Sequence, residues 1–131
     1  MVFKDKIALG VSFIALSLSI GSTIIGEKRA LFEKERSLKA ELSITLSKVM
    51  DLSKENAILI KDYMTDEKNQ SYFQLQSSNI SQENTFLIQQ AMYLASEIPG
   101  LVTPVELNTI ASSNAQAGDL PMAEKYYLLA A

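Results

Sequence analysis

An uncharged stretch near the N-terminus, "IALGVSFIALSLSIGSTII" at residues 7–25, most constrains how this chain can fold. At about 1.5 Å per helical residue it spans roughly 28 Å, close to the hydrocarbon thickness of a bilayer. Charged residues flank it on both sides, in "KDK" and "EKR". Five hydroxyl residues interrupt the run, which weakens the insertion signal without forbidding it. We predict a single N-terminal transmembrane helix, with residues 1–26 as the membrane anchor.

Two other interpretations of this stretch remain open, a cleaved secretory signal ending near "SIG" at 19–21 and a buried helix of a soluble protein. Ile24 and Ile25 continue the apolar run past the cleavage position, which favours an uncleaved anchor. More Lys and Arg residues follow the run than precede it, so the positive-inside tendency predicts a single-pass protein with a cytoplasmic C-terminal region. Ser17 and Gly21 have a spacing that lets two membrane helices approach, which keeps a homo-oligomer open.

Residues 27–64 contain neither Gly nor Pro and predict a long amphipathic helix that continues the anchor. An imperfect heptad seam runs along it: Leu31, Leu38, Leu42, Val49, Leu52, Leu59 and Tyr63, with Glu35, Thr45 and Asn56 in the remaining core positions. Three polar positions make a poor coiled coil, so we expect the seam to pack against later helices of the same chain. A parallel dimer with Asn56 fixing the register is the alternative. A basic cluster of Lys28, Arg29, Lys34 and Arg36 is a candidate for contact with anionic lipid headgroups.

The distal half predicts a linker followed by helices. Residues 65–79 are polar and without a sustained period, and a helix then follows from about Ser81 to Ile98. In "TPVE", Thr103 and Glu106 match a capping box that opens the next helix. Gly118 supplies a left-handed stop, after which Asp119 can cap a last helix. The short turn requires these last two helices to be antiparallel.

This closing hairpin resembles a tetratricopeptide repeat (TPR), whose outline is W-x-x-L-G-x-x-Y followed by A-x-x-x-F and a proline. The matching positions, which the resemblance makes packing residues, are Leu107, Ile110, Ala111, Gly118, Ala123, Tyr127 and Ala130. Asn114 replaces the first tyrosine, and the closing proline would lie beyond the last residue. The resemblance implies an all-α fold with a TPR-like region at 80–131, whose repeat at 104–131 is incomplete. With its anchor, the chain is similar in architecture to bacterial inner-membrane proteins that carry such repeats.

The residue types present argue against catalysis. The chain has no cysteine and no histidine, which removes thiolate nucleophiles, the usual zinc sites and the commonest general base. The tight acidic cluster of Asp62, Asp66 and Glu67 is typical of a solvated helix end. We therefore expect no enzyme, cofactor or metal, and the acidic balance from Asp62 onward excludes nucleic acid as a partner. The sequence favours a membrane-anchored TPR-like scaffold or adaptor that binds a protein or peptide near the bilayer. The alternative is a self-associating single-pass structural protein without a peptide-binding groove.

Overall fold

The structure, a computed structural model, describes the backbone of residues 2–65 and 69–131, and the side chains of residue 12 and of residues 14–65 and 69–131. Its elements are α1 (Val2–Thr65), α2 (Gln70–Glu97), the short 3₁₀ helix η2 (Pro99–Leu101), α3 (Pro104–Gln116) and α4 (Leu120–Ala130). Within these described ranges there is no strand, and the predicted all-α class is confirmed.

The chain divides into two compact units, residues 1–37 and 38–131. The first is the N-terminal part of α1. Six of its apolar side chains are between 47% and 69% exposed: Ile14, Leu16, Leu18, Ile20, Ile24 and Ile25. Among the described residues, no helix was found with the combination of length and apolarity that crossing a membrane requires. Residues 7–11 and 13, which belong to the predicted span, lie outside the described side chains.

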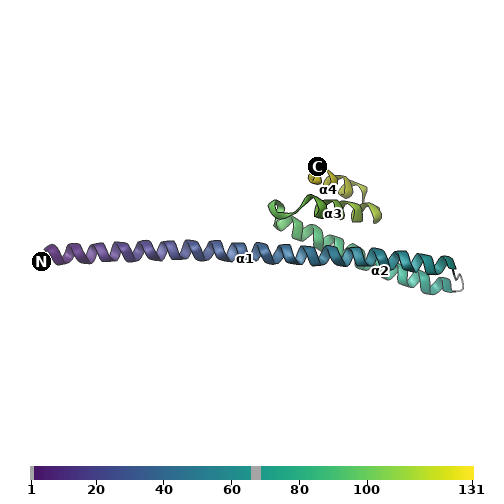
Figure 1. The fold of residues 1–131 in the computed structure, drawn as a ribbon, viewed down its shortest axis with the longest axis horizontal. Coiled ribbons are helices and arrows are strands. Elements are labelled where there is room, and N and C mark those ends of the chain that lie inside the picture. The colour runs from purple at the N-terminus through teal and green to yellow at the C-terminus, as the bar shows by residue number, and fades with distance from the viewer. Residues whose placement is uncertain (1, 66–68) are drawn as a thin grey trace. The chain divides into compact units, whose positions relative to one another are not determined.

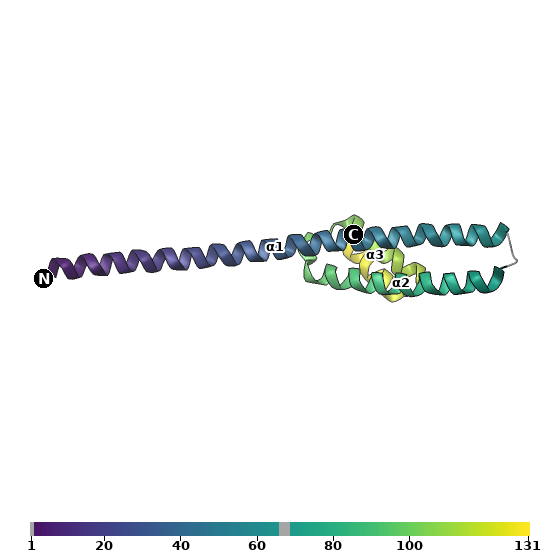
Figure 2. The same ribbon diagram turned by 90° about the horizontal axis from the view of Figure 1, so that it is seen from below.

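In the second unit, α2 runs back beside the C-terminal part of α1 (Figures 1 and 2). The predicted seam lies between them, with Leu42, Thr45, Val49 and Leu52 all buried. The hydroxyl of Thr45 donates to the backbone carbonyl of Glu41 at 2.9 Å, which satisfies the one polar group at the centre of this seam. The expectation that the seam packs within its own chain is confirmed from Leu38 to Leu52, whereas Leu31 is 58% exposed and lies in the first unit. A parallel dimer through the buried residues would have to displace α2.

The start of α2 corrects the predicted linker at 65–79. The helix begins at Gln70 instead of near Ser81, so most of the residues read as a loop are helical. Serine and asparagine are weak helix formers, and their presence in this segment favoured the prediction of a loop. Tertiary contacts decide it: the rings of Tyr63 and Phe73 stack with their centroids 4.2 Å apart. This contact extends the α1–α2 packing to the C-terminal end of α1 and the first turn of α2.

The capping box that opens α3 is confirmed. The backbone N–H of Glu106 donates to the hydroxyl of Thr103 at 3.2 Å, and the Glu106 carboxylate accepts the backbone N–H of Thr103 at 2.9 Å. Pro104 occupies the first helical position, where its missing N–H costs nothing. These contacts fix where α3 begins relative to the preceding chain.

The turn between α3 and α4 also follows the sequence. Gly118 has φ +85°, a left-handed conformation that favours glycine. The N–H of Asp119 donates to the carbonyl of Asn114 at 2.9 Å and that of Gly118 to Ala115 at 3.1 Å, the two bonds of a Schellman motif. The Asp119 carboxylate then accepts the N–H of Met122 at 3.1 Å and caps α4. The result is a tight antiparallel α3–α4 hairpin.

This second hairpin packs on one face of the α1–α2 pair, with α3 nearer to it than α4 (Figures 1 and 2). One hydrophobic cluster joins all four helices, with Leu42 from α1, Ala91 from α2, Ile110 and Ala111 from α3 and Tyr126 from α4. Ala91 and Ala111 have no exposed surface, so small side chains lie where the helices meet. The shared core fixes α3 beside α1, and side chains of both helices line one surface.

Candidate functional site, a groove between the first helices of two hairpins

A groove lies between α1 and α3, which are the first helices of the two successive hairpins. It has a volume of about 430 Å³. Val49, Met50, Ser53 and Lys54 line it from α1, and Val105, Asn108, Thr109, Ser112, Ser113 and Gln116 line it from α3. We call this surface the α1–α3 groove.

Two hydroxyl groups that line the α1–α3 groove already donate hydrogen bonds within α3, whereas apolar side chains at its rim are exposed to solvent. The hydroxyls of Thr109 and Ser113 donate to the carbonyls four residues before them, at 2.9 and 2.8 Å. Met50 and Val105 are 53% and 74% exposed and give the rim apolar contact area. Lys54 is the one charged residue among those that line the groove, and its ammonium lies 3.9 Å from the exposed carboxylate of Asp51. A pair of this length and exposure contributes little, so Lys54 is available to a ligand.

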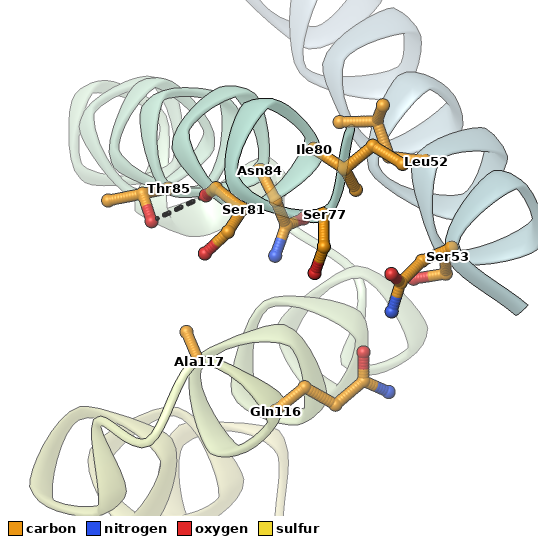
Figure 3. A pocket seen from close by; sticks show the side chains of 10 residues that line it. Leu52, Ser53, Ser77, Ile80, Ser81, Asn84, Thr85, Gln116 and Ala117 are labelled. Carbon is orange, nitrogen blue, oxygen red and sulfur yellow. Dashed lines mark hydrogen bonds between the residues drawn. The ribbon is translucent and has the colours of Figure 1, made fainter. Parts of the chain in front are cut away.

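A second hollow of about 370 Å³ adjoins the groove and shares Ser53 and Gln116 with it. We call it the polar cavity. Figure 3 shows Ser77, Ser81 and Asn84 projecting from α2 toward the C-terminal end of α3, where Gln116 and the cap residue Ala117 lie. Leu52 and Ile80 supply apolar walls, and Ser53, Asn56 and Thr85 complete the lining. No residue that lines the polar cavity is charged.

Asn84 is the unusual residue of the polar cavity. Its Oδ1 atom is buried and has no hydrogen-bond partner among the described residues. An unsatisfied buried acceptor costs about 1–3 kcal/mol, so such atoms are rare in folded proteins. Ser77, Ser81 and Asn84 recur at helical spacing and so lie on one face of α2. This spacing is the sequence pattern from which the lining on α2 could have been predicted. The predicted seam residue Asn56 also faces this cavity.

The TPR-like positions are mostly internal. Ile110, Ala111 and Ala123 are buried, Leu107 and Ala130 are half-buried, and Gly118 forms the turn. Tyr127, expected as a packing residue, is instead 46% exposed, and its neighbour Tyr126 is buried in the core. Adjacent residues lie about 100° apart around a helix, so Tyr126 and Tyr127 cannot both face the core. Burial raises the pKa of Tyr126 above its ordinary value.

Asn114, the main departure from the TPR outline, is buried and satisfied. Its Nδ2 donates to the carbonyl of Ile110 at 2.9 Å and lies 3.5 Å from the sulfur of Met92. The bond to Ile110 lies within α3, so the buried amide is satisfied by its own helix. Asn114 contacts α2 only through the thioether of Met92, where the outline has a tyrosine.

Lys39 fixes α3 against α1, and no sequence pattern pointed to it. Its ammonium binds the Glu106 carboxylate and donates to the carbonyl of Leu101 at 2.7 Å. Partial burial alone would raise the pKa of Glu106. The hydrogen bonds from Lys39 and Thr103 and the charge of Lys39 outweigh that effect and hold this pKa below its ordinary value. Lys39 and Glu106 are 67 positions apart in the sequence, so their contact could not be predicted from a local pattern.

The basic residues proposed for headgroup contact, Lys28, Arg29, Lys34 and Arg36, are all exposed and belong to the first unit, whereas the groove belongs to the second. Asp62 is exposed, and its sequence neighbours Asp66 and Glu67 lie outside the described residues. In the part of the chain that the structure describes, no group of three or more carboxylates could hold a metal ion. No protein-family model, no curated protein and no solved structure matches this chain.

Proposed function

We propose that this chain is a membrane-anchored, TPR-like adaptor that binds a peptide segment of a protein partner near the bilayer. One observation carries the proposal: two successive antiparallel hairpins share a core, and their first helices, α1 and α3, line one groove. In helical repeat proteins the stacked repeats create an extended concave surface for binding. The α1–α3 groove supports the same use here.

The dimensions and chemistry of the groove suit an extended peptide. From Val105 to Gln116, α3 rises about 16 Å, which matches roughly five extended residues at about 3.3 Å each. Asn108, Ser112 and Gln116 recur every four residues and form a row of hydroxyl and amide groups along the groove. Such side chains can pair with the backbone N–H and C=O groups of an extended segment. Met50 and Val105 offer apolar contact beside the row.

The first unit supports the membrane part of the proposal. Large apolar side chains from Ile14 to Ile25 are exposed all along this part of α1, and exposed apolar surface of this extent favours contact with protein or lipid. In this proposal the basic cluster that follows contacts anionic headgroups on the cytoplasmic side, and the groove faces the cytoplasm.

Membrane anchoring is tested by fractionation of the full chain expressed in bacteria. We expect it in the membrane fraction after washing with alkaline carbonate, which releases peripheral proteins. Leu18→Lys places a charge in the apolar run and should shift the chain toward the soluble fraction. Ser43→Lys adds the same charge to an exposed position of the second unit and is the control. Complete release of the unaltered chain by the wash contradicts the anchor.

Peptide binding is tested by selection from a random heptapeptide display library on the full chain in lipid nanodiscs. Ser53 is exposed and is shared by the groove and the polar cavity, so Ser53→Phe obstructs the site without disturbing the core. We expect selected peptides to bind this variant at least tenfold more weakly. Ser47→Phe introduces the same ring at another exposed position of α1 and should leave binding unchanged. Equal binding to both variants, or the absence of any enriched peptide, refutes the proposed groove.

A further inference from the structure

The outward face of α2 carries a regular row of seven exposed residues. Their spacing alternates between three and four positions, as in the seam of two packed helices. We call this set the α2 stripe: Tyr72, Leu75, Asn79, Gln82, Phe86, Gln89 and Tyr93. Its four large apolar side chains are between 59% and 66% exposed. The buried residues of α2, such as Leu87, Ala91 and Leu94, lie on the opposite side of the helix.

The surface of α2 is unusual in carrying almost no charge. Residues 70–97 contain only two charged side chains, Glu83 and Glu97, and neither belongs to the α2 stripe. Residues 38–65 of α1, a segment of the same length, contain eight: Lys39, Glu41, Lys48, Asp51, Lys54, Glu55, Lys61 and Asp62. Interfaces between proteins are depleted of charge at their centre and enriched in tyrosine and phenylalanine. The α2 stripe therefore has the composition of a protein interface.

The same composition argues against a lipid surface as the occupant of the α2 stripe. Helices that lie on a membrane carry Lys and Arg on their polar face, and residues 70–97 contain neither. A strongly charged protein would find no opposite charge on the stripe and would lose hydration there. The stripe therefore fits an uncharged protein surface in which apolar and amide side chains alternate.

A second copy of this chain supplies such a surface. In a parallel pair each residue of the α2 stripe meets its own copy, so apolar side chains meet apolar ones and amides meet amides. Asn79, Gln82 and Gln89 each carry donors and an acceptor, so each can hydrogen-bond to the same side chain of the other copy. An antiparallel pair that aligns Asn79 with Gln82 places Tyr72 against Gln89 and Tyr93 beyond the start of α2. The parallel pair thus buries more of the apolar surface.

The area of the α2 stripe is sufficient for a specific pair. An aromatic side chain buries about 150–250 Å². At roughly 60% exposure, Tyr72, Phe86 and Tyr93 each offer about 90–150 Å², which is about 540–900 Å² for two copies. Leu75 and the three amides add to this on both sides. The total reaches the roughly 1,000 Å² that a specific interface requires.

From these observations we propose that the α2 stripe is a homodimer interface, at which the α2 helices of two copies pack in parallel with Asn79 beside its own copy. A polar residue at such a position fixes the register of two packed helices. No residue of the stripe lines the α1–α3 groove, so the pair has two grooves. Two linked grooves bind a partner that carries two matching segments more tightly than one groove does.

Disulfide cross-linking tests the pairing, because the chain has no cysteine of its own. Asn79→Cys and Gln89→Cys each place one thiol on the stripe of the full chain in detergent. A parallel pair brings both positions next to their own copies, whereas an antiparallel pair can do so at one position only. We expect both variants to form disulfide-linked dimers under mild oxidation. Gln74→Cys places the thiol at an exposed position of α2 outside the stripe and should remain largely monomeric.

Phe86→Glu tests whether the stripe drives association. It places two carboxylates against each other in a parallel pair, and Phe86 is exposed in the single chain, so the fold is preserved. By analytical ultracentrifugation we expect the full chain to be a dimer at about 10 μM and Phe86→Glu to associate at least about 100-fold more weakly. The unfolding temperature of the unaltered chain should rise with protein concentration, and that of the variant should not. Leu128→Glu exchanges an exposed apolar residue of α4 for the same acid and should leave the dimer intact.

Four results overturn the inference. A monomer at every concentration up to about 100 μM assigns the stripe to a different protein. Dimers that persist in Phe86→Glu, or that are lost in Leu128→Glu, place the contact on another surface. Equal cross-linking of Gln74→Cys and Asn79→Cys indicates random collision, and cross-linking at only one of positions 79 and 89 contradicts the parallel register. Peptide binding fails separately, because Ser53→Phe alters the groove and leaves the stripe unchanged.

Discussion

Lys39→Met should show how strongly the start of α3 is held against α1. Lys39 makes two charge-assisted contacts, with the Glu106 carboxylate and with the carbonyl of Leu101. Hydrogen bonds to charged groups contribute about 1.5–3 kcal/mol when buried, whereas exposed ion pairs contribute about 0–1 kcal/mol. The Lys39 and Glu106 side chains are 29% and 16% exposed, which is an intermediate case. We expect the free energy of unfolding to fall by about 1.5–2 kcal/mol.

The assay is thermal unfolding of the full chain in detergent, followed by far-ultraviolet circular dichroism. For a unit of this size, about 4–8 °C of unfolding temperature corresponds to each kcal/mol, so the expected decrease is about 6–16 °C. Glu106→Gln keeps the capping box, since glutamine can also accept the N–H of Thr103, and removes only the charge. The double variant should show a coupling of about 1 kcal/mol between the two positions.

Acidification gives a second readout of the same pair. The pKa of Glu106 is lower in the folded chain than its ordinary value of 4.5, so the fold favours the charged form. Its stabilising contribution is present above pH 4.5 and is lost as the pH falls through the lowered folded pKa. Lys39→Met should lose less stability on acidification than the unaltered chain. If both lose the same amount, or if Lys39→Met unfolds at the unaltered temperature near neutral pH, the pair does not hold α3 in place.

Two further variants test the core and the turn. Leu42→Ala removes a fully buried side chain from the cluster that joins all four helices. The free energy of unfolding, measured with urea, should therefore fall by about 3–5 kcal/mol. A decrease below about 1 kcal/mol means that the cluster is not the core. Gly118→Ala meets no atom within 4 Å but must adopt a positive φ, so it should cost about 1–2 kcal/mol, whereas Gly100→Ala, which has equal space and no positive φ, should be nearly neutral by the same measurement.

Local chemistry made parts of the fold predictable. The capping box at Thr103 and Glu106 and the left-handed Gly118 depend on neighbouring residues only, and both are present as expected. The seam on α1 was predictable for a different reason: spacing alone places its residues on one face of a helix. Thr45 can lie inside the seam although it is polar, because its hydroxyl donates to the backbone carbonyl of Glu41.

The unpredicted features depend on contacts between distant residues. The early start of α2 rests on packing such as the Tyr63–Phe73 stack, which outweighs the weak helix propensity of the residues between Gln70 and Ser81. The burial of Tyr126 instead of Tyr127 depends on how α4 is rotated against α3. The polar cavity needs three helices to be placed before its side chains converge, so no stretch of sequence contains it.

The contacts that hold the second unit together close very different lengths of chain, and this difference predicts an order of folding. The turn at Gly118 joins adjacent helices, and Tyr63 and Phe73 are ten positions apart, whereas Lys39 and Glu106 are separated by 67. Closing a longer loop costs more entropy, so the two hairpins should form before they dock. We therefore expect the Lys39 pair to form late, so that its loss accelerates unfolding and leaves the folding rate nearly unchanged. Lys39 should thus slow the separation of α3 from α1 once the groove between them has formed.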